Sequence, residues 1–288
     1  GPSVYMPGQG TLTITDGVLN GGVSLRMGQV TISGGTINAT TGNIDDPSEY
    51  YNYSGNAWLP DALYVFGGTY TSGDKTYGNS LNLKITGGTL NCSNGKGSAV
   101  AVYDIAKEAQ KANVDISGGT LITNSETRSA YQVLSLKDID VDNPGNGYGN
   151  EEYEGNVESG ISGGSFSSDV SQYVEEGKIA IKYTSSNDEK TYHVGTPEQI
   201  NDIVKNAAKG DKIEVLKGDI ALSIPVGGVE VSNTGDGDVT VNDEAVTKGT
   251  PVVTTEPAQQ PTIPSQQETA GETEAAGNSA KTGDDFNM

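Results

Sequence analysis

Three carboxylates alternate along a short stretch of the chain, at Asp138, Asp140 and Asp142. Side-chain oxygens on such a stretch could converge on Ca²⁺, which takes six to eight oxygen ligands in proteins. The spacing does not fit an EF-hand, because Asn143 stands in place of the turn glycine and Gly149 in place of the final glutamate. The pattern therefore predicts a possible calcium site, with a solvated strand face as the alternative. No other cofactor is expected.

An aromatic segment is the second place with recognisable chemistry. Residues 45–61 combine several tyrosines and the single tryptophan of the chain with carboxylates and amides. Aromatic rings stack on sugar rings while polar neighbours bond the hydroxyls, and Tyr and Trp are also enriched as anchors of protein interfaces. The alternative is a loop that folds back and buries its rings. We predict a ligand-binding loop with the contact residues Tyr50, Tyr51, Tyr53, Trp58 and Asp61.

Residues suited to acid–base or nucleophilic catalysis are scarce. The chain has one histidine, His193, one cysteine, Cys92, and two arginines, Arg26 and Arg128. We expect His193 to be a surface or structural residue. Cys92 alternates in phase with Leu90, so it should behave as a small buried apolar side chain. Neither arginine is close in sequence to an acidic cluster, and no catalytic residue is predicted.

Composition indicates a β-rich chain with an acidic surface. Glycine accounts for 40 of 288 residues, and valine plus isoleucine (42) far outnumber leucine (13), which favours strands. Asp and Glu number 38 against 17 Lys and Arg, which gives a net charge of −21. Nucleic acid and anionic lipid are excluded as partners, because both are bound through clustered Lys and Arg. No apolar run is long enough to insert into a membrane.

A short phrase built around a Gly-Gly pair recurs along residues 14–166. Each copy joins two alternating strands at a corner where glycine can take a positive φ and leaves room for the next coil. A further strand begins 11 residues after the corner in two coils, at Ala99 and Ala130. Such repeats bury their faces only by stacking, so three strands per coil predict a right-handed parallel β-helix over residues 4–184. The clear copies are 32–37, 85–90, 116–121 and 161–166, and the looser ones are 14–19 and 65–70.

The phrase Ile-Ser-Gly-Gly-Thr-Leu at 116–121 and its relatives resemble the repeats of pectin-lyase-like β-helices in surface proteins of Gram-positive gut bacteria. The resemblance covers residues 4–184 and implies the fold. It implies no single chemistry, because the family includes lyases, hydrolases, adhesins and passive stalks. The motif set of the β-helix polygalacturonases is absent. A β-sandwich is the alternative architecture.

A cap and a small β-rich module are predicted after the repeats. Residues 168–177 should form a short helix and 179–194 a hairpin that covers the last coil. In the module, residues 185–249, Thr196 and Gln199 form a capping box around Pro197, and Gly210 should end the helix. Four strand-like runs follow at 212–216, 221–226, 228–231 and 239–241.

The two ends of the chain are set apart from the fold. Residues 1–3 match an expression-tag scar. Residues 250–288 are rich in Pro, Thr, Glu and Gln without apolar periodicity, which predicts a disordered linker. Near its end Lys281, Thr282 and Gly283 resemble a degenerate LPxTG signal, at which sortase cuts between Thr and Gly. The resemblance implies attachment to peptidoglycan and an extracellular, wall-anchored location.

These features together predict a non-enzymatic, adhesin-like surface protein that presents a β-helix to a host protein or glycan on a mucosal surface. A secreted polysaccharide lyase or glycosidase with the same fold is the first alternative, and a passive stalk is the second. A basic residue beside a carboxylate cluster would favour the enzyme, and none is visible in the sequence.

Overall fold

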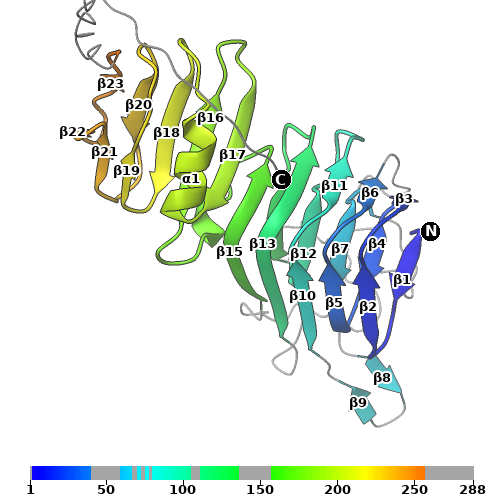
Figure 1. The fold of residues 1–288 in the computed structure, drawn as a ribbon. Helices are drawn as coiled ribbons and strands as arrows, with labels where there is room; N and C mark the ends of the chain where they lie inside the picture. The colour runs from blue at the N-terminus through cyan, green and yellow to red at the C-terminus, as the bar shows by residue number, and fades with distance from the viewer. Residues whose placement is uncertain are drawn as a thin grey trace, which may run out of the picture. The chain divides into compact units, whose positions relative to one another are not determined.

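The computed structural model describes residues 2–39, 59–66, 70–72, 75–77, 80–104, 111–135 and 157–256. These residues belong to one compact unit, residues 1–257. The remaining 31 residues, 258–288, form a separate unit that lies outside the described residues. Figure 1 shows that the described part is built almost entirely of strands, so the prediction of an all-β chain is confirmed at this level.

Most of the described residues between Val4 and Phe166 lie in columns of parallel strands, each strand pairing with the strand one repeat away. One column is a five-stranded parallel sheet. Its register matches the sequence repeat, because Val100 pairs with Tyr131 and with Leu63. The strands in spatial order are β1 (Val4–Met6), β4 (Val23–Leu25), β7 (Leu63–Phe66), β12 (Val100–Asp104) and β14 (Tyr131–Ser135).

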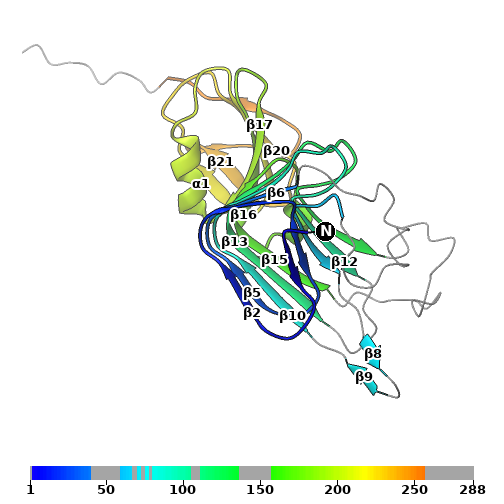
Figure 2. The ribbon, with the colours of Figure 1, turned by 90° about the vertical axis from the view of Figure 1, so that its right-hand side faces the viewer.

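Two further columns meet at the Gly-Gly corners. Strands β13 (Ala112–Thr123) and β15 (Val157–Phe166) run through the corner and belong to both columns. Figure 2 views the stack from its N-terminal end, where strands before the corner lie one behind another. The first column contains β2 (Thr11–Ile14), β5 (Gly28–Ile32) and β10 (Leu81–Ile85), and the second contains β3 (Val18–Asn20), β6 (Thr36–Ala39) and β11 (Thr89–Cys92). This parallel pairing does not fit the antiparallel β-sandwich alternative.

The Gly-Gly corners require glycine because one coil lies against the next through its backbone. A Cβ built on Gly118 would lie 2.5 Å from the carbonyl oxygen of Thr86, and one on Gly87 would lie 2.5 Å from that of Ser33. The second glycine of the pair also needs the left-handed region, as Gly119 shows with φ +92°. The same contact therefore recurs at successive corners and sets the stacking distance.

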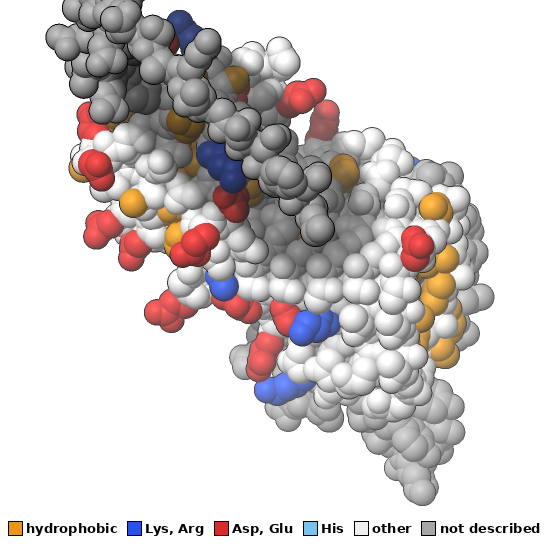
Figure 3. All heavy atoms as spheres, in the orientation of Figure 1, with side chains coloured by type: hydrophobic (Ala, Val, Ile, Leu, Met, Phe, Trp, Pro, Cys, Tyr) orange, Lys and Arg blue, Asp and Glu red, His pale blue; other side chains and the backbone are white. Residues whose placement is uncertain are grey.

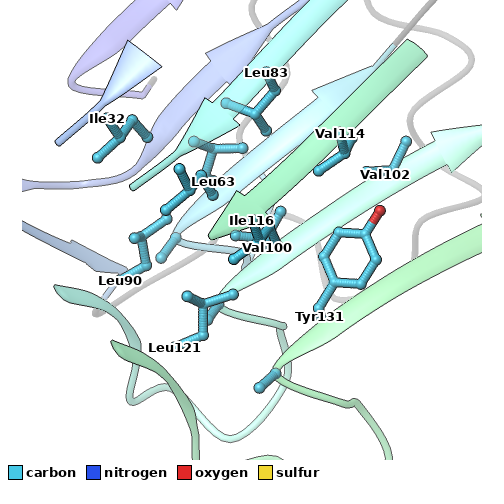
Figure 4. Packing of buried hydrophobic residues seen from close by; sticks show 14 of the residues in the cluster. Ile32, Leu63, Leu83, Leu90, Val100, Val102, Val114, Ile116, Leu121 and Tyr131 are labelled. Carbon is cyan, nitrogen blue, oxygen red and sulfur yellow. The ribbon is translucent and has the colours of Figure 1, made fainter. Parts of the chain in front are cut away.

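Inward side chains of the columns form one apolar core. Isoleucine and leucine occupy equivalent inward positions in successive coils, as at Ile32, Ile85 and Ile116, each of which is fully buried. Figure 4 shows Ile32 and Ile116 among the core side chains that pack between the sheets. The ring of Tyr131 joins this core and meets Tyr173 edge-on, with ring centroids 4.8 Å apart. Cys92 belongs to the same core, as predicted.

An antiparallel hairpin extends the sheet beyond the repeats. Strand β17 (Lys190–Gly195) pairs with β15 on one side and with β16 (Ile179–Thr184) on the other. The predicted hairpin is confirmed, but it does not close the sheet, because β16 continues it into β18. The sheet goes on through β18 (Lys212–Lys217), β20 (Glu230–Asn233) and β23 (Val252–Val253).

The second module has an apolar core of its own, in which α1 (Pro197–Val204) packs with Ile200 and Val204 inward. The predicted capping box is present, since Thr196 and Gln199 bond each other's backbone N–H groups. The smaller strands of the described region are β19 (Ile220–Leu222), β21 (Val239–Val241), β22 (Glu244–Ala245), β8 (Tyr70–Ser72) and β9 (Lys75–Tyr77).

Three predicted boundaries differ from the structure. Residues 168–177 contain only a 3₁₀ turn, η2 (Ser171–Tyr173), because Val174 is buried and bridges to Ile161 as extended chain. Helix α1 ends at Val204 rather than near Gly210, and Ala208 is exposed. The folded part of the chain also extends beyond residue 250, where the linker was predicted to begin, since Val252 pairs with Val231 and Thr254 is buried.

The corner geometry generates the first prediction. Gly118→Ala should lower the free energy of unfolding by about 1–3 kcal/mol, because the new methyl group overlaps a backbone carbonyl that cannot rotate away. Gly8→Ala is the matched control, since a Cβ there has nothing within 4 Å. Denaturant titration of both variants measures the difference. Equal stability of the two variants would show that the coils do not approach each other as closely as described.

Candidate functional site

Most of the predicted site residues lie outside the described residues. This holds for Tyr50, Tyr51, Tyr53 and Trp58 of the aromatic loop, for Asp138, Asp140 and Asp142, and for Lys281, Thr282 and Gly283. Among the described residues, no group of three or more His, Cys, Asp or Glu side chains is placed to hold a metal ion. The aromatic loop, the calcium site and the sorting signal therefore remain predictions.

Asp61 is the one predicted ligand contact that the structure describes, and it is buried. Its carboxylate is fully enclosed, accepting a hydrogen bond from the backbone N–H of Ser98 (2.7 Å) and another from the hydroxyl of Tyr103 (2.7 Å). Burial raises the pKa of Asp61 above its ordinary value, although both hydrogen bonds and the charge of Arg128 oppose the shift. The prediction that Asp61 contacts a ligand on an exposed loop is wrong. Its carboxylate instead ties two coils together.

Asp61 belongs to a polar cluster on the outward side of the β4–β7–β12–β14 sheet. Outward side chains there are buried, with Tyr64 at 1% and Tyr103 at 2% exposure. Arg128 interacts with the Tyr103 hydroxyl and acts electrostatically on Asp61. We call Asp61, Tyr103 and Arg128 the buried polar cluster. Sequence reasoning missed it because the three residues are brought together only by the stacking of coils.

The buried polar cluster is not fully satisfied by hydrogen bonds among the described residues. Arg128 Nη1 and Ser98 Oγ are both buried and have no hydrogen-bond partner there. An unpaired buried donor costs about 1–3 kcal/mol, so such groups are unusual in a purely structural network. Arg128 can supply positive charge beside the phenol of Tyr103. Burial and the negative charge of Asp61 hold the pKa of that phenol well above its ordinary value.

The two other reactive side chains have structural surroundings, as predicted. Cys92 donates to the carbonyl oxygen of Pro60 (3.1 Å), and burial raises the pKa of its thiol to about 11, so it is a poor nucleophile at neutral pH. His193 lies on β17 with its Nδ1 3.0 Å from the hydroxyl of Ser165, and burial lowers its pKa. Cys92 contacts the neighbouring coil at Pro60, and His193 links β17 to β15.

The outward side of the β2–β5–β10–β13–β15 sheet differs from the buried polar cluster in being accessible and polar. Amide side chains bond from coil to coil, as Asn113 Nδ2 donates to Asn82 Oδ1 (2.7 Å). Charges are few and paired: Lys84 lies 3.9 Å from Asp115, and Lys111 lies 3.1 Å from Glu158. Figure 3 shows this side of the stack as mostly pale, with a few Lys and Asp or Glu side chains among the uncharged ones. We call it the polar face; its rows are Thr11, Gln29, Asn82, Asn113, Glu158 and Thr13, Thr31, Lys84, Asp115.

Two open hollows occur near the second module, one between residues 171–179 and residues 216–219 and 236–237, the other within residues 233–248. They measure about 470 and 530 Å³ and share Asp236 and Gly237 in their walls. The carboxylate of Asp236 is exposed and pairs with Lys248 at 2.7 Å. Neither hollow gathers several polar side chains that lack partners, so neither resembles a built ligand site.

No protein-family model matches this chain, and no curated protein or solved structure matches it either. No helix among the described residues is long and apolar enough to cross a membrane. Inferences about the function of this chain therefore depend on its own residues, and its resemblance to pectin-lyase-like proteins stays a prediction.

Two buried aspartates should give opposite pH dependences of stability. The pKa of Asp61 is raised in the folded protein, so its contribution to stability is present at low pH and is lost as pH rises through the folded pKa. Burial also acts to raise the pKa of Asp211, but hydrogen bonds from Tyr183, Ala208 and Ser186 outweigh it and lower that pKa. Its contribution is present at neutral pH and is lost as pH falls.

Thermal melts of Asp61→Asn and Asp211→Asn across acidic and neutral pH measure these slopes. Asp61→Asn should lose less stability than the parent as pH rises from acidic to neutral. Asp211→Asn should be clearly less stable than the parent at neutral pH, with the gap closing in acid. Parallel curves for Asp61→Asn and the parent would mean that Asp61 is not desolvated.

Proposed function

We propose that this chain is a non-enzymatic, wall-anchored surface protein, and that residues 4–184 are a right-handed parallel β-helix presenting binding surfaces. The partners are host proteins or glycans on a mucosal surface. Three columns of parallel strands, repeated in register, support the β-helix, since right-handed connection is the rule for parallel strands. Attachment to peptidoglycan through Lys281, Thr282 and Gly283 would place the protein outside the cell.

The polar face is the observation that carries a glycan-binding proposal. Neighbouring strands lie about 4.8 Å apart, so each row offers a hydroxyl, amide or charged group at nearly regular intervals. Sugars are bound through hydrogen bonds to groups of these kinds. The face is nearly neutral on a chain of net charge −21, which suits an uncharged ligand lying across several strands. The strands that carry the polar face are rigid, because their inward-pointing side chains belong to the apolar core.

A pair of matched glutamine variants tests the polar face. Gln29→Ala should weaken binding to the glycans that the parent retains on an array, because Gln29 is exposed in one row, between Thr11 and Asn82. Gln172→Ala, which changes an exposed glutamine within η2, should bind as the parent does. Thermal melts confirm that both variants are folded. Trp58→Ala forms a separate arm: loss of binding in that variant alone would place recognition in the aromatic loop instead.

The buried polar cluster favours a second candidate function, a polysaccharide lyase or glycosidase. It brings a basic residue, Arg128, next to a carboxylate and a phenol, the arrangement that was not visible in the sequence. Against catalysis, Asp61 is enclosed and both of its oxygens already accept hydrogen bonds. A binding role therefore remains the leading proposal.

Incubation with a panel of polysaccharides separates the two functions. A binding protein should release neither new reducing ends nor unsaturated products. Product formation that disappears in Arg128→Ala but persists in Arg26→Ala, the only other arginine variant the chain offers, would establish the enzyme and overturn the leading proposal.

A further inference from the structure

The single histidine of the chain lies where the sheet passes from the repeats into the second module. Strand β17 pairs with β15 over residues 164–166, and His193 is opposite Ser165 in the middle of this pairing. In the described part of the chain, it is the one strand pairing that connects the repeat strands to the hairpin β16–β17 and, through it, to β18. We call it the β15–β17 junction. Attachment of the second module to the repeats therefore depends on a short stretch of sheet centred on His193.

The two faces of the hairpin β16–β17 belong to different cores. Ala180 and Val194 pack into the core of the repeats, whereas Ile179 and Ile181 pack into the core of the second module. Because side chains alternate along a strand, His193 points to the same side as its partner Ile181 and away from Val194. Helix α1 packs against β17 (Figure 1). The imidazole is thus enclosed at the boundary between the two parts of the fold.

The surroundings of His193 hold nothing that would stabilise a charged imidazole. Its Nδ1 lies 3.0 Å from Oγ of Ser165, a neutral group. Burial lowers the pKa of His193, and no charged side chain opposes this shift.

The charged and titratable groups on the elements packed against His193 are directed elsewhere. On β15 the one such group is Glu158, which pairs with Lys111. Lys182 of β16 is opposite Tyr192, so it points to the other face of the hairpin, where it pairs with Glu214. The remaining groups on β16, β17 and α1 bond other partners or are exposed: Tyr183, Lys190, Glu198 and Asp202.

We infer that His193 makes the β15–β17 junction acid-sensitive: a proton on its imidazole places an uncompensated charge at the boundary of the two cores and loosens the pairing of β17 with β15. The folded protein holds this proton less tightly than the unfolded chain does. The stability contributed by the neutral ring is therefore fully present above the ordinary pKa of about 6.5 and is lost as pH falls below it. Acid then weakens the attachment of the second module before it affects the repeat core. This inference does not depend on the proposed binding function.

An NMR titration of the full chain tests the junction directly, because the one imidazole gives a single set of ring signals. From about pH 8 to about pH 5 the ring should titrate with a midpoint below the ordinary value of about 6.5. Backbone amides of Gly164, Ser165 and Phe166 should change with the same midpoint. Amides of Thr89 and Thr120, which bond at the corners of the repeats, should not follow it.

Two variants separate His193 from other acid-sensitive groups. His193→Asn keeps a polar side chain beside Ser165 but takes up no proton, so the parent should lose at least about 2 °C of melting temperature relative to it between neutral pH and about pH 5. Asp211→Asn is the control: it removes a different acid-sensitive contact, on the other side of the hairpin turn, and should keep the amide changes at the junction.

Three results would overturn the inference. They are a midpoint of the His193 ring at or above 6.5, junction amides that change in the same way in His193→Asn, and a constant difference in melting temperature between that variant and the parent. If His193→Asn does not fold, the ring midpoint and the junction amides of the parent decide the question.

Discussion

Close backbone approach at the Gly-Gly corners is the constraint on which the repeat region depends. Thr36, Thr89 and Thr120 each donate a backbone hydrogen bond to the second glycine of the preceding corner, or to Gly17 in the looser copy. Bare glycine backbones let these bonds form while the flanking strands pair in register. The register then stacks like side chains upon like, which fills the core with Ile, Leu and Val. Burial of each such side chain contributes about 1.5–3 kcal/mol to the free energy of unfolding. Correct register at one corner therefore stabilises the fold through every core side chain that it aligns along the strands.

The same stacking explains why the two outer sides of the repeat region differ. Outward positions beside β10 and β13 carry Asn, Lys and Asp, which remain hydrated and pair with neighbours in the next coil. Outward positions on β7 and β12 carry Tyr64 and Tyr103, which are enclosed, with Asp61 and Arg128 at their margin. Accessible polar groups suit recognition of a ligand, whereas the enclosed side holds coils together. This contrast underlies the preference for a binding function.

Sequence reasoning predicts the local and periodic features well. The strands predicted 11 residues after the corners, at Ala99 and Ala130, correspond to β12 and β14, which pair with each other. The capping box is predicted from Thr196, Pro197 and Gln199 alone. Features that depend on distant residues were not predictable. Val174 is extended rather than helical because its side chain is buried against the repeat core, where it bridges to Ile161. Asp61 contacts Tyr103 only after two coils stack. Likewise, hairpin β16–β17 looked like a cap, but the sheet continues through it because β18 supplies another edge.

Native-state hydrogen exchange at the corner threonines tests stacking in register most directly. The amides of Thr89 and Thr120 donate to Gly35 and Gly88 of the preceding coil, 2.9 Å away in both cases. If the coils stack as described, these amides should exchange only through the largest unfolding events of the repeat region, at rates close to each other. Exchange at close to the rate of an unprotected amide, in either threonine, would contradict stacking through the corners.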